Sequence, residues 1–331
     1  MAVEREPSII IHENALRPRA ELTSAVETLE QIHGCSREEA LERLRRMIDN
    51  PEPTIELPID RKLYTVEDLQ ARKPFPVVPG PCSGESPENV MESARQLKEQ
   101  GAFAFRAPLR KPRSRAEKHQ GAGDIIVPAI DRARRTCDML SFVEVADSRE
   151  LITSRLCADV IWVGARFNPQ FYRDVAKDPR PVGLKRAPGS TPEADIDLLS
   201  YFADRLDNVF IIERGIYTPR STGTPHSRYT LDTTGIPPLR ERIKEEYGID
   251  IPIWVDPSHA AGQRCFVEPE ALTAVGVADG FLVEFHPRPE EALSDAAQQL
   301  PTALFGEFRD RLFRAADALP STPLVPRTPA R

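Results

Sequence analysis

The chain has 331 residues, of which 40% are hydrophobic and 29% are charged, and its formal net charge is −7. This length can bury the core of one large domain with an extension, and the acidic balance argues against a nucleic-acid partner. No apolar run approaches the roughly 18 residues that a membrane-spanning helix needs, so no membrane partner is expected. The five cysteines are odd in number and form no CxxC pair, which indicates free thiols and a cytoplasmic protein.

The first 72 residues are predicted to form a helical and extended N-terminal extension. Two stretches within residues 15–50 combine helical spacing with strong helix formers. Ser36 followed three residues later by Glu39 predicts a capping box for the second helix. The proline-rich stretch 51–76 is predicted to be extended.

A unit of one short apolar run and one helical segment repeats from about residue 75. The predicted strands are 75–83, 102–108, 139–147, 158–166, 180–186, 208–215, 251–259 and 280–287. The predicted helices are 86–100, 124–136, 148–156, 191–207, 237–248, 268–276 and 295–319. This alternation indicates an α/β fold with a parallel sheet, and eight units fit a (β/α)8 TIM barrel over residues 73–320. A disordered tail is predicted over residues 321–331. A doubly wound open sheet is the alternative, but no glycine-rich phosphate fingerprint follows the first strand.

Positively charged side chains follow several of these strands at their carboxyl ends, which share one mouth in a barrel. So many cations repel one another unless an anion lies among them, and arginine matches phosphate and carboxylate oxygens in bidentate geometry. A multiply anionic ligand is therefore predicted at the mouth, although any one of these residues alone could be a solvated loop charge. The residues expected there are Arg106, Lys111, Arg113, Arg166, Lys185, Arg186 and Arg214, with Glu144 from the third strand.

A second group at the same mouth combines a thiol, an imidazole and two carboxylates. Cys82 follows the first strand, His259 the seventh, Glu284 lies on the eighth, and Asp295 begins the next segment. The first and last strands become neighbours when a barrel closes, so these four side chains can converge on a divalent metal ion. His286, two residues beyond Glu284 on the same strand, is a competing ligand, but it is expected closer to the barrel rim, beside the metal ligands and not among them.

The motifs that carry these residues resemble those of the 3-deoxy-D-arabino-heptulosonate 7-phosphate (DAHP) synthases, type I. The segments GPCSGES, RKPRS followed by HQGAG, VGAR, LKR, ERG, RYTLD, DPSHAAG and VEFHPRPEEALSD occur in the same order as in that family. They span roughly residues 77–305. The resemblance implies a metal-dependent transferase on a (β/α)8 barrel.

The resemblance also implies roles for individual residues. The metal ligands would be Cys82, His259, Glu284 and Asp295. The ion expected first is Mn²⁺, with Fe²⁺, Co²⁺ or Zn²⁺ as alternatives. Phosphoenolpyruvate would be held by Arg106, Lys111, Arg166, Lys185 and Arg214. The segment from Lys111 to Ser114 would receive erythrose 4-phosphate through Arg113 and Ser114. Lys185 is expected to transfer a proton, and the catalytic set would be Lys185, Cys82 and His259.

The implied reaction condenses phosphoenolpyruvate with erythrose 4-phosphate, releases phosphate and opens the shikimate pathway. A rival hypothesis is a paralogue that uses another aldehyde in specialised metabolism. A hypothesis of another class is a non-catalytic barrel that binds a phosphorylated metabolite and regulates a partner enzyme. The complete four-ligand set argues against this last hypothesis. A homo-oligomer, either a dimer or a tetramer, is expected.

The segment around the aldehyde site departs from the family pattern. The family usually has RGGAFKPRT, whereas this chain has RAPLRKPRS. Two glycines are thus replaced by Ala107 and Pro108, and an aromatic residue is replaced by Arg110. Because proline fixes φ and lacks an N–H donor, the loop is expected to be stiffer and differently placed. The acceptor aldehyde could therefore differ from erythrose 4-phosphate.

Overall fold

The computed structural model describes residues 26, 27, 30, 35–42, 62–111, 119–164, 168–218 and 228–320. The strands are β1 (Val77–Gly80), β2 (Ala104–Arg106), β3 (Leu140–Val145), β4 (Val160–Val163), β5 (Val182–Lys185), β6 (Val209–Glu213), β7 (Ile253–Val255), β8 (Gly280–His286) and β9 (Leu300–Pro301). The α-helices are α3 (Val66–Gln70), α4 (Pro87–Glu99), α5 (Val127–Cys137), α6 (Ser148–Ser154), α7 (Pro169–Ala176), α8 (Pro192–Leu199), α9 (Ile236–Tyr247), α10 (Pro257–Ala261), α11 (Arg264–Ala274) and α12 (Phe305–Asp317). Short 3-10 helices are η1 (Gly123–Ile126), η2 (Ser200–Asn208), η4 (Pro289–Glu291) and η5 (Thr302–Leu304).

The strands β1 to β8 form one parallel sheet that curls into a barrel. Their order is β1-β8-β7-β6-β5-β4-β3-β2, so the first strand pairs with the last. The ends of the sheet meet where Gly80 approaches β2, since a Cβ at Gly80 would lie 2.1 Å from the carbonyl oxygen of Arg106. Only glycine permits this approach. The (β/α)8 barrel is confirmed and the doubly wound sheet is excluded, because β1 and β2, the two ends of this strand order, also contact each other and so close the ring.

The barrel interior has an apolar lower layer and a polar upper layer. Alternate residues of a strand face the same side, and the inward residues near the amino ends are apolar, including Phe142, Trp162, Phe210 and Trp254. Trp254 packs against Phe210 and Phe142 at ring-centroid distances of 4.5 and 6.0 Å. Further along the same strands, the buried side chains become charged. The sequence therefore places a charged layer on top of a packed aromatic floor.

Helix α3 closes the amino end of the barrel. Its buried residues Val66 and Leu69 belong to the same apolar cluster as the lower layer. Thr65 and Asp68 form a capping box, in which the Asp68 N–H donates to Thr65 Oγ1 and the Thr65 N–H donates to Asp68 Oδ2. The extended structure predicted over residues 51–76 is therefore wrong at α3, because capping and burial outweigh the nearby prolines. The division of the chain at residue 72 stays a prediction.

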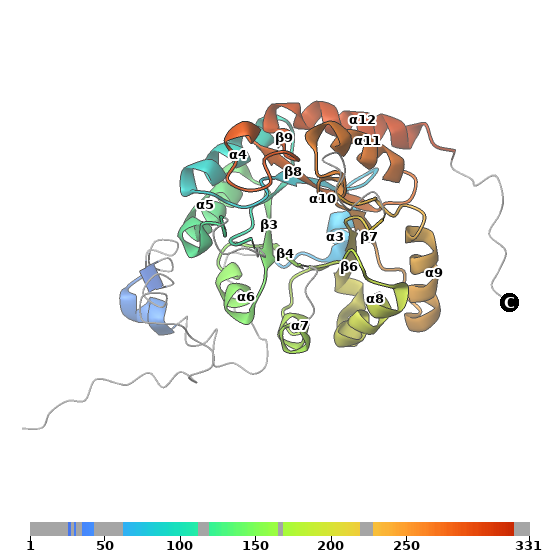
Figure 1. Ribbon diagram of the computed structural model, residues 1–331. Helices are drawn as coiled ribbons and strands as arrows, with labels where there is room; N and C mark the ends of the chain where they lie inside the picture. Colours follow the sequence, from blue (N-terminus) through green and yellow to red (C-terminus); the bar gives the residue numbers. More distant parts are fainter. Residues whose placement is uncertain are drawn as a thin grey trace, which may run out of the picture.

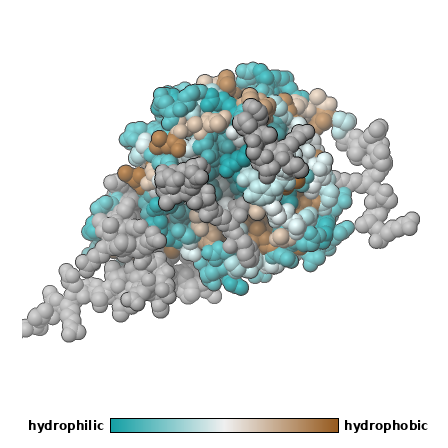
Figure 2. Space-filling model, in the orientation of Figure 1, coloured by the Kyte–Doolittle hydropathy of each residue, from teal (hydrophilic) through white to brown (hydrophobic). Residues whose placement is uncertain are grey.

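The helices form a ring around the strands (Figure 1), and the colouring of Figure 2 is hydrophilic over much of this ring.

The predicted capping box is present, since the Ser36 N–H donates to Glu39 Oε2 and the Glu39 N–H donates to Ser36 Oγ. Helix α7 was not predicted, and the segment 295–304 is not the predicted helix but contains β9 and η5. Among the described residues, none of the helices has the length and apolarity to span a membrane. The tail 321–331 lies outside the described residues.

Candidate metal and anion site

The four predicted metal ligands converge above the apolar layer. Cys82, His259, Glu284 and Asp295 each offer one ligand atom, and these atoms lie within 4.8 Å of one another. Cys82 Sγ lies 3.4 Å from Asp295 Oδ2, and His259 Nε2 lies 3.5 Å from Glu284 Oε1. A sulfur, a nitrogen and two carboxylate oxygens are suitable donors for a divalent transition metal. The residues present therefore fit a metal of this kind.

Asp256 orients His259, a role not predicted from the sequence. Its Oδ1 accepts the His259 backbone N–H at 3.0 Å and so caps α10, while its Oδ2 lies 2.7 Å from His259 Nδ1. A carboxylate at Nδ1 favours the proton on that nitrogen and leaves the Nε2 lone pair facing the cluster. The signal was present in the sequence Asp-Pro-Ser-His, because an N-cap aspartate followed by proline predicts a helix start.

Neighbouring amide groups hold Glu284 and Cys82, and Asp295 has an unusual backbone conformation. Gln298 Nε2 donates to Glu284 Oε2 at 2.6 Å, and the Cys82 N–H donates to Gln299 Oε1 at 3.0 Å. Asp295 has φ of +45°, a conformation that costs energy for a residue other than glycine. The strained backbone at Asp295 thus directs its carboxylate oxygen into the cluster. The two glutamines were missed because uncharged amides gave no chemical signal.

The Lys111 ammonium lies among the four donors. Its Nζ is 2.9 Å from His259 Nε2, 3.7 Å from Glu284 Oε1 and 3.8 Å from Asp295 Oδ2. Burial opposes the charged form of Lys111, but the coulombic effect of neighbouring acidic groups outweighs it and raises the pKa. The cluster therefore attracts positive charge, which is a second sign that it suits a cation.

Two ligands have strongly shifted pKa values. Burial, reinforced by the charge of Glu284, raises the pKa of the Cys82 thiol to about 12. Burial also holds the pKa of His259 well below its usual range, with Lys111 acting in the same direction against Asp256. His259 is consequently neutral at pH 7 and able to bind a metal. The Cys82 thiol has to lose its proton to a metal ion, so metal binding is expected to release a proton.

A buried guanidinium and a buried ammonium lie beside the cluster, and the guanidinium has unused hydrogen-bonding capacity. Arg106 is fully buried over the Trp162 ring, at 5.0 Å from the centroid, and its Nη2 lies 3.4 Å from Glu284 Oε1. Among the described residues, its Nε and Nη1 have no hydrogen-bond partner. Lys185 Nζ lies 2.6 Å from Asp256 Oδ2, and burial lowers the pKa of Lys185. Unpaired buried donors of this kind imply an anionic ligand.

The remaining predicted residues have different positions. Arg214 lies over the Tyr229 ring with its Nε buried and without a hydrogen-bond partner in the described chain. Glu144 is buried with Oε1 close to Gly164, at the end of β4. Arg186 was predicted to face the mouth, but its guanidinium pairs with Asp195 at 2.7 Å and with Glu213 at 2.6 Å. That prediction is wrong, since Lys185 and Arg186 are adjacent and must face opposite sides of β5.

His286 does not belong to the metal cluster. Its Nδ1 accepts the Arg288 N–H and its Nε2 lies 3.0 Å from Asn89 Nδ2, so both ring nitrogens have partners away from the four ligands. The prediction that it competes as a ligand is therefore not supported. The predicted substrate contacts Arg113, Ser114 and Arg166 lie outside the described residues.

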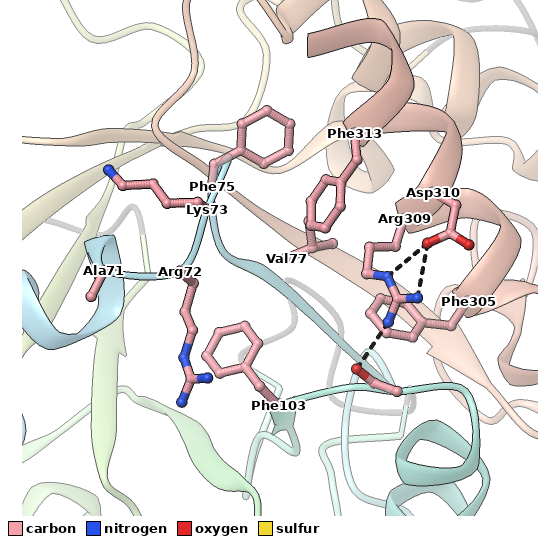
Figure 3. A pocket seen from close by; sticks show the side chains of 11 residues that line it. Ala71, Arg72, Lys73, Phe75, Val77, Phe103, Phe305, Arg309, Asp310 and Phe313 are labelled. Atoms are coloured by element: carbon pink, nitrogen blue, oxygen red, sulfur yellow. Dashed lines mark hydrogen bonds and ion pairs between the residues drawn. The ribbon is translucent and has the colours of Figure 1, made fainter. Parts of the chain in front are cut away.

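A separate cavity lies at the other end of the barrel (Figure 3). Its volume is about 460 Å³, and its walls include the rings of Phe75, Phe103, Phe305 and Phe313. Phe75 and Phe103 precede β1 and β2, whereas the charged layer follows these strands. Active sites of such barrels lie at the carboxyl ends of the strands. The candidate site is accordingly the charged layer, not this cavity.

The fold and the site together define a class of protein: a (β/α)8 barrel that gathers four side chains able to hold a metal ion, and buried cationic side chains, at its mouth. Residues 69–316 match the sequence model of the DAHP synthetase I family. The chain therefore belongs to this family, and it is an enzyme of the DAHP synthase class. The hypothesis of a non-catalytic regulatory barrel is not supported.

Known relatives agree with this assignment. The chain is 36% identical over 250 residues to the phospho-2-dehydro-3-deoxyheptonate aldolase of Thermotoga maritima, covering 74% of this chain and 71% of that protein. It is 27% identical over 268 residues to the 2-dehydro-3-deoxyphosphooctonate aldolase of Francisella philomiragia, covering 76% and 95% respectively. A crystal structure of the DAHP synthase from Thermotoga maritima superposes with a TM-score of 0.64 at 34% identity, covering 74% of this chain and 70% of that one.

Proposed function

We propose that this enzyme condenses phosphoenolpyruvate with erythrose 4-phosphate and water to give 3-deoxy-D-arabino-heptulosonate 7-phosphate and phosphate. The observation that carries the proposal is the four-donor cluster beside Arg106 and Lys185, whose cationic groups face the mouth. This arrangement suits one substrate that is multiply anionic and one whose carbonyl has to be polarised. The reaction would be the first step of the shikimate pathway, in the cytoplasm.

The proposed metal site consists of Cys82, His259, Glu284 and Asp295, with Mn²⁺ as the ion and Fe²⁺, Co²⁺ or Zn²⁺ as alternatives. A bound divalent ion supplies Lewis acidity to a carbonyl oxygen. Asp256 keeps the Nε2 of His259 directed at the ion by holding the other ring nitrogen. The thiol of Cys82 would be deprotonated when the site is loaded.

The cationic side chains would bind phosphoenolpyruvate and stabilise the charge that develops in the reaction. Within the described parts of the chain, Arg106 Nε and Nη1 make no hydrogen bond and are available to a ligand, and Lys111 and Arg214 lie at the same mouth. Arg166, outside the described residues, is assigned the same role. Because burial lowers its pKa, Lys185 is the residue proposed to move a proton. Glu144 would hold Lys111 and Lys185 in place, since its charge acts on both ammonium groups.

A second candidate function is a condensation of phosphoenolpyruvate with a different aldehyde. The observation that favours it is the replacement of the family's aromatic residue by Arg110, which forms ion pairs with Glu150 and Asp124. These ion pairs hold the chain just before Arg113 and Ser114 through a charged side chain, where the family usually has an aromatic one. The acceptor site, unlike the metal cluster, therefore differs from the family pattern.

We also propose that the enzyme is a homo-oligomer, a dimer or a tetramer. Light scattering of the purified protein measures this oligomeric state.

The test of the function is phosphate release from phosphoenolpyruvate plus erythrose 4-phosphate, with and without a chelator. Turnover that the chelator abolishes and Mn²⁺ restores is the expected result. The Cys82→Ser variant is expected to need a much higher Mn²⁺ concentration for the same rate. Turnover that is insensitive to chelators would contradict the metal proposal. Absence of turnover with erythrose 4-phosphate, together with turnover of another phosphosugar aldehyde, would establish the second candidate.

A further inference from the structure

The loop between β2 and η1 carries Lys111 into the site and is fastened on its outer side by Arg110. The Arg110 Nε lies 3.2 Å from Glu150 Oε1, in the first turn of α6. Its Nη2 lies 3.8 Å from Asp124 Oδ1, in η1. A Cβ at Gly123 would come within 3.0 Å of the guanidinium, so this glycine makes room for it. The Arg110 side chain is therefore flanked by two carboxylates and a glycine.

The partner of Arg110 is also connected to the end of β3. Glu150 Oε2 accepts the Ala146 N–H at 2.9 Å, and its side chain is only 3% exposed. Ala146 comes two residues after Glu144, which faces the mouth beside Lys111. A single buried carboxylate thus links the loop that bears Lys111 to the strand that bears Glu144.

Backbone hydrogen bonds hold the chain on both sides of Arg110. The Gly123 N–H donates to the Leu109 carbonyl and the Lys111 N–H donates to the Gln120 carbonyl, both at 2.8 Å. Arg110 and Lys111 are adjacent, and their side chains reach opposite partners: Glu150 outside and His259 inside. Holding one side chain in place outside the loop consequently determines where the other side chain enters the mouth.

We propose that Arg110 is a positioning residue, which by pairing with Glu150 and Asp124 keeps Lys111 directed into the substrate site. The proposal rests on the proposed function, because it assigns to Arg110 a part in binding phosphoenolpyruvate. Arg110 acts through Lys111. The family's usual aromatic residue at this position cannot form the pair, so the anchor distinguishes this chain.

The test compares Arg110→Met, which keeps the length of the side chain, with Glu150→Gln, which keeps its shape. Both variants are assayed well above pH 7, where Glu150, whose pKa burial raises to about 7, carries its charge. Each is expected to raise the KM for phosphoenolpyruvate by ~10-fold with a smaller change in kcat, because a small displacement of a binding group weakens binding strongly. The double variant is expected to be no worse than the poorer single variant, since both remove the same pair. Arg110→Lys is expected to restore part of the loss.

A matched control is Arg240→Met, which removes a partly buried ion pair between α9 and Asp279 on the far side of the barrel. It is expected to lower the melting temperature without changing either KM or kcat. If Arg110→Met behaves in the same way as this control, Arg110 has a merely structural role and the proposal is overturned.

Amide hydrogen exchange distinguishes a failure of the positioning role of Arg110 from a failure of the proposed reaction. Faster exchange over residues 107–111 and 119–124 in Arg110→Met, but not in Arg240→Met, is expected whichever aldehyde the enzyme accepts. If the wild type does not turn over erythrose 4-phosphate, the proposed function fails. The affinity for phosphoenolpyruvate, measured by calorimetry, then replaces KM, and a loss of about the same size supports the positioning role. Unchanged exchange, or faster exchange with unchanged affinity, overturns it.

Discussion

Asp256 is buried at the point where the metal cluster and the cationic group meet. Its Oδ2 lies 2.7 Å from His259 Nδ1, 2.6 Å from Lys185 Nζ and 3.9 Å from Arg106 Nη1. Burial alone would raise the pKa of this carboxyl, but His259 and Lys185 hold it well below its usual range. One carboxylate thus fixes the tautomer of a ligand and offsets the charge of two cations.

We predict that Asp256→Asn weakens metal binding by ~10-fold to ~100-fold, as the loss of such a partner usually does. Asparagine is as good an N-cap as aspartate, so α10 should remain folded. Metal affinity is measured by titration against a competing chelator. The control is Asp250→Asn, which removes the exposed partner of Arg240 and should leave the affinity unchanged. Equal affinities for wild type and Asp256→Asn would show that His259 needs no such support.

Glu150 provides a prediction for the pH dependence of stability. Burial, and then the charge of Asp147, raises the pKa of Glu150 from 4.5 to about 7. The folded protein therefore holds this proton more tightly than the unfolded chain, so the free energy of unfolding falls as pH rises from about 4.5 to about 7. Glu150→Gln cannot lose a proton. The wild type should lose stability relative to this variant across that window, as measured by urea unfolding at several pH values. A difference that does not vary with pH would contradict the shift.

Much of the site could be predicted from residues alone, but their orientation could not. Cys82, His259, Glu284 and Asp295 were found because unusual donors follow consecutive strands, where a barrel gathers them. Arg186 was misplaced because the alternation of side chains along β5 was not applied to it. The role of Asp256 was missed although Asp-Pro-Ser-His predicts a helix start, because the contact between the Asp256 and His259 side chains depends on how α10 turns them.

At the scale of the element, α3 is the clearest case of tertiary structure overriding local sequence. The helix has only five residues, far below the length at which an isolated helix is stable. It forms because its capping box fixes the first turn and because Val66 and Leu69 insert into the barrel floor. Helix α7 and strand β9 were missed for a related reason: eight and two residues give too little periodicity to detect.

We predict that Leu69→Ala lowers the free energy of unfolding by about 2–4 kcal/mol, because it leaves a cavity in a layer that cannot collapse freely. The measurement is chemical denaturation followed by circular dichroism. Leu63→Ala is the control, since Leu63 is 45% exposed and its truncation should cost less than about 0.5 kcal/mol. Similar losses for both variants would indicate that α3 does not close the barrel in solution.

At the scale of the whole molecule, closure of the barrel creates the site. Cys82 follows β1 while Glu284 lies on β8, and these strands pair in register from Val77 and Phe281 to Gly80 and Glu284. Residues more than 200 positions apart are thereby brought into one cluster. The count of eight strand-helix units was sufficient to predict this, because a closed parallel barrel has essentially one topology. The N-terminal extension offered no comparable repeat, so its arrangement could not be predicted.

The aromatic floor beneath the site has an optical consequence. The chain contains only two tryptophans, and both are buried in this layer, Trp162 under the Arg106 guanidinium and Trp254 between Phe142 and Phe210. Neither indole N–H has a hydrogen-bond partner among the described residues. Indole emission depends on the local electric field, and here Trp162 lies directly against the Arg106 guanidinium, whose charge an anionic ligand would neutralise. Intrinsic fluorescence therefore reports on the mouth of this barrel without any label.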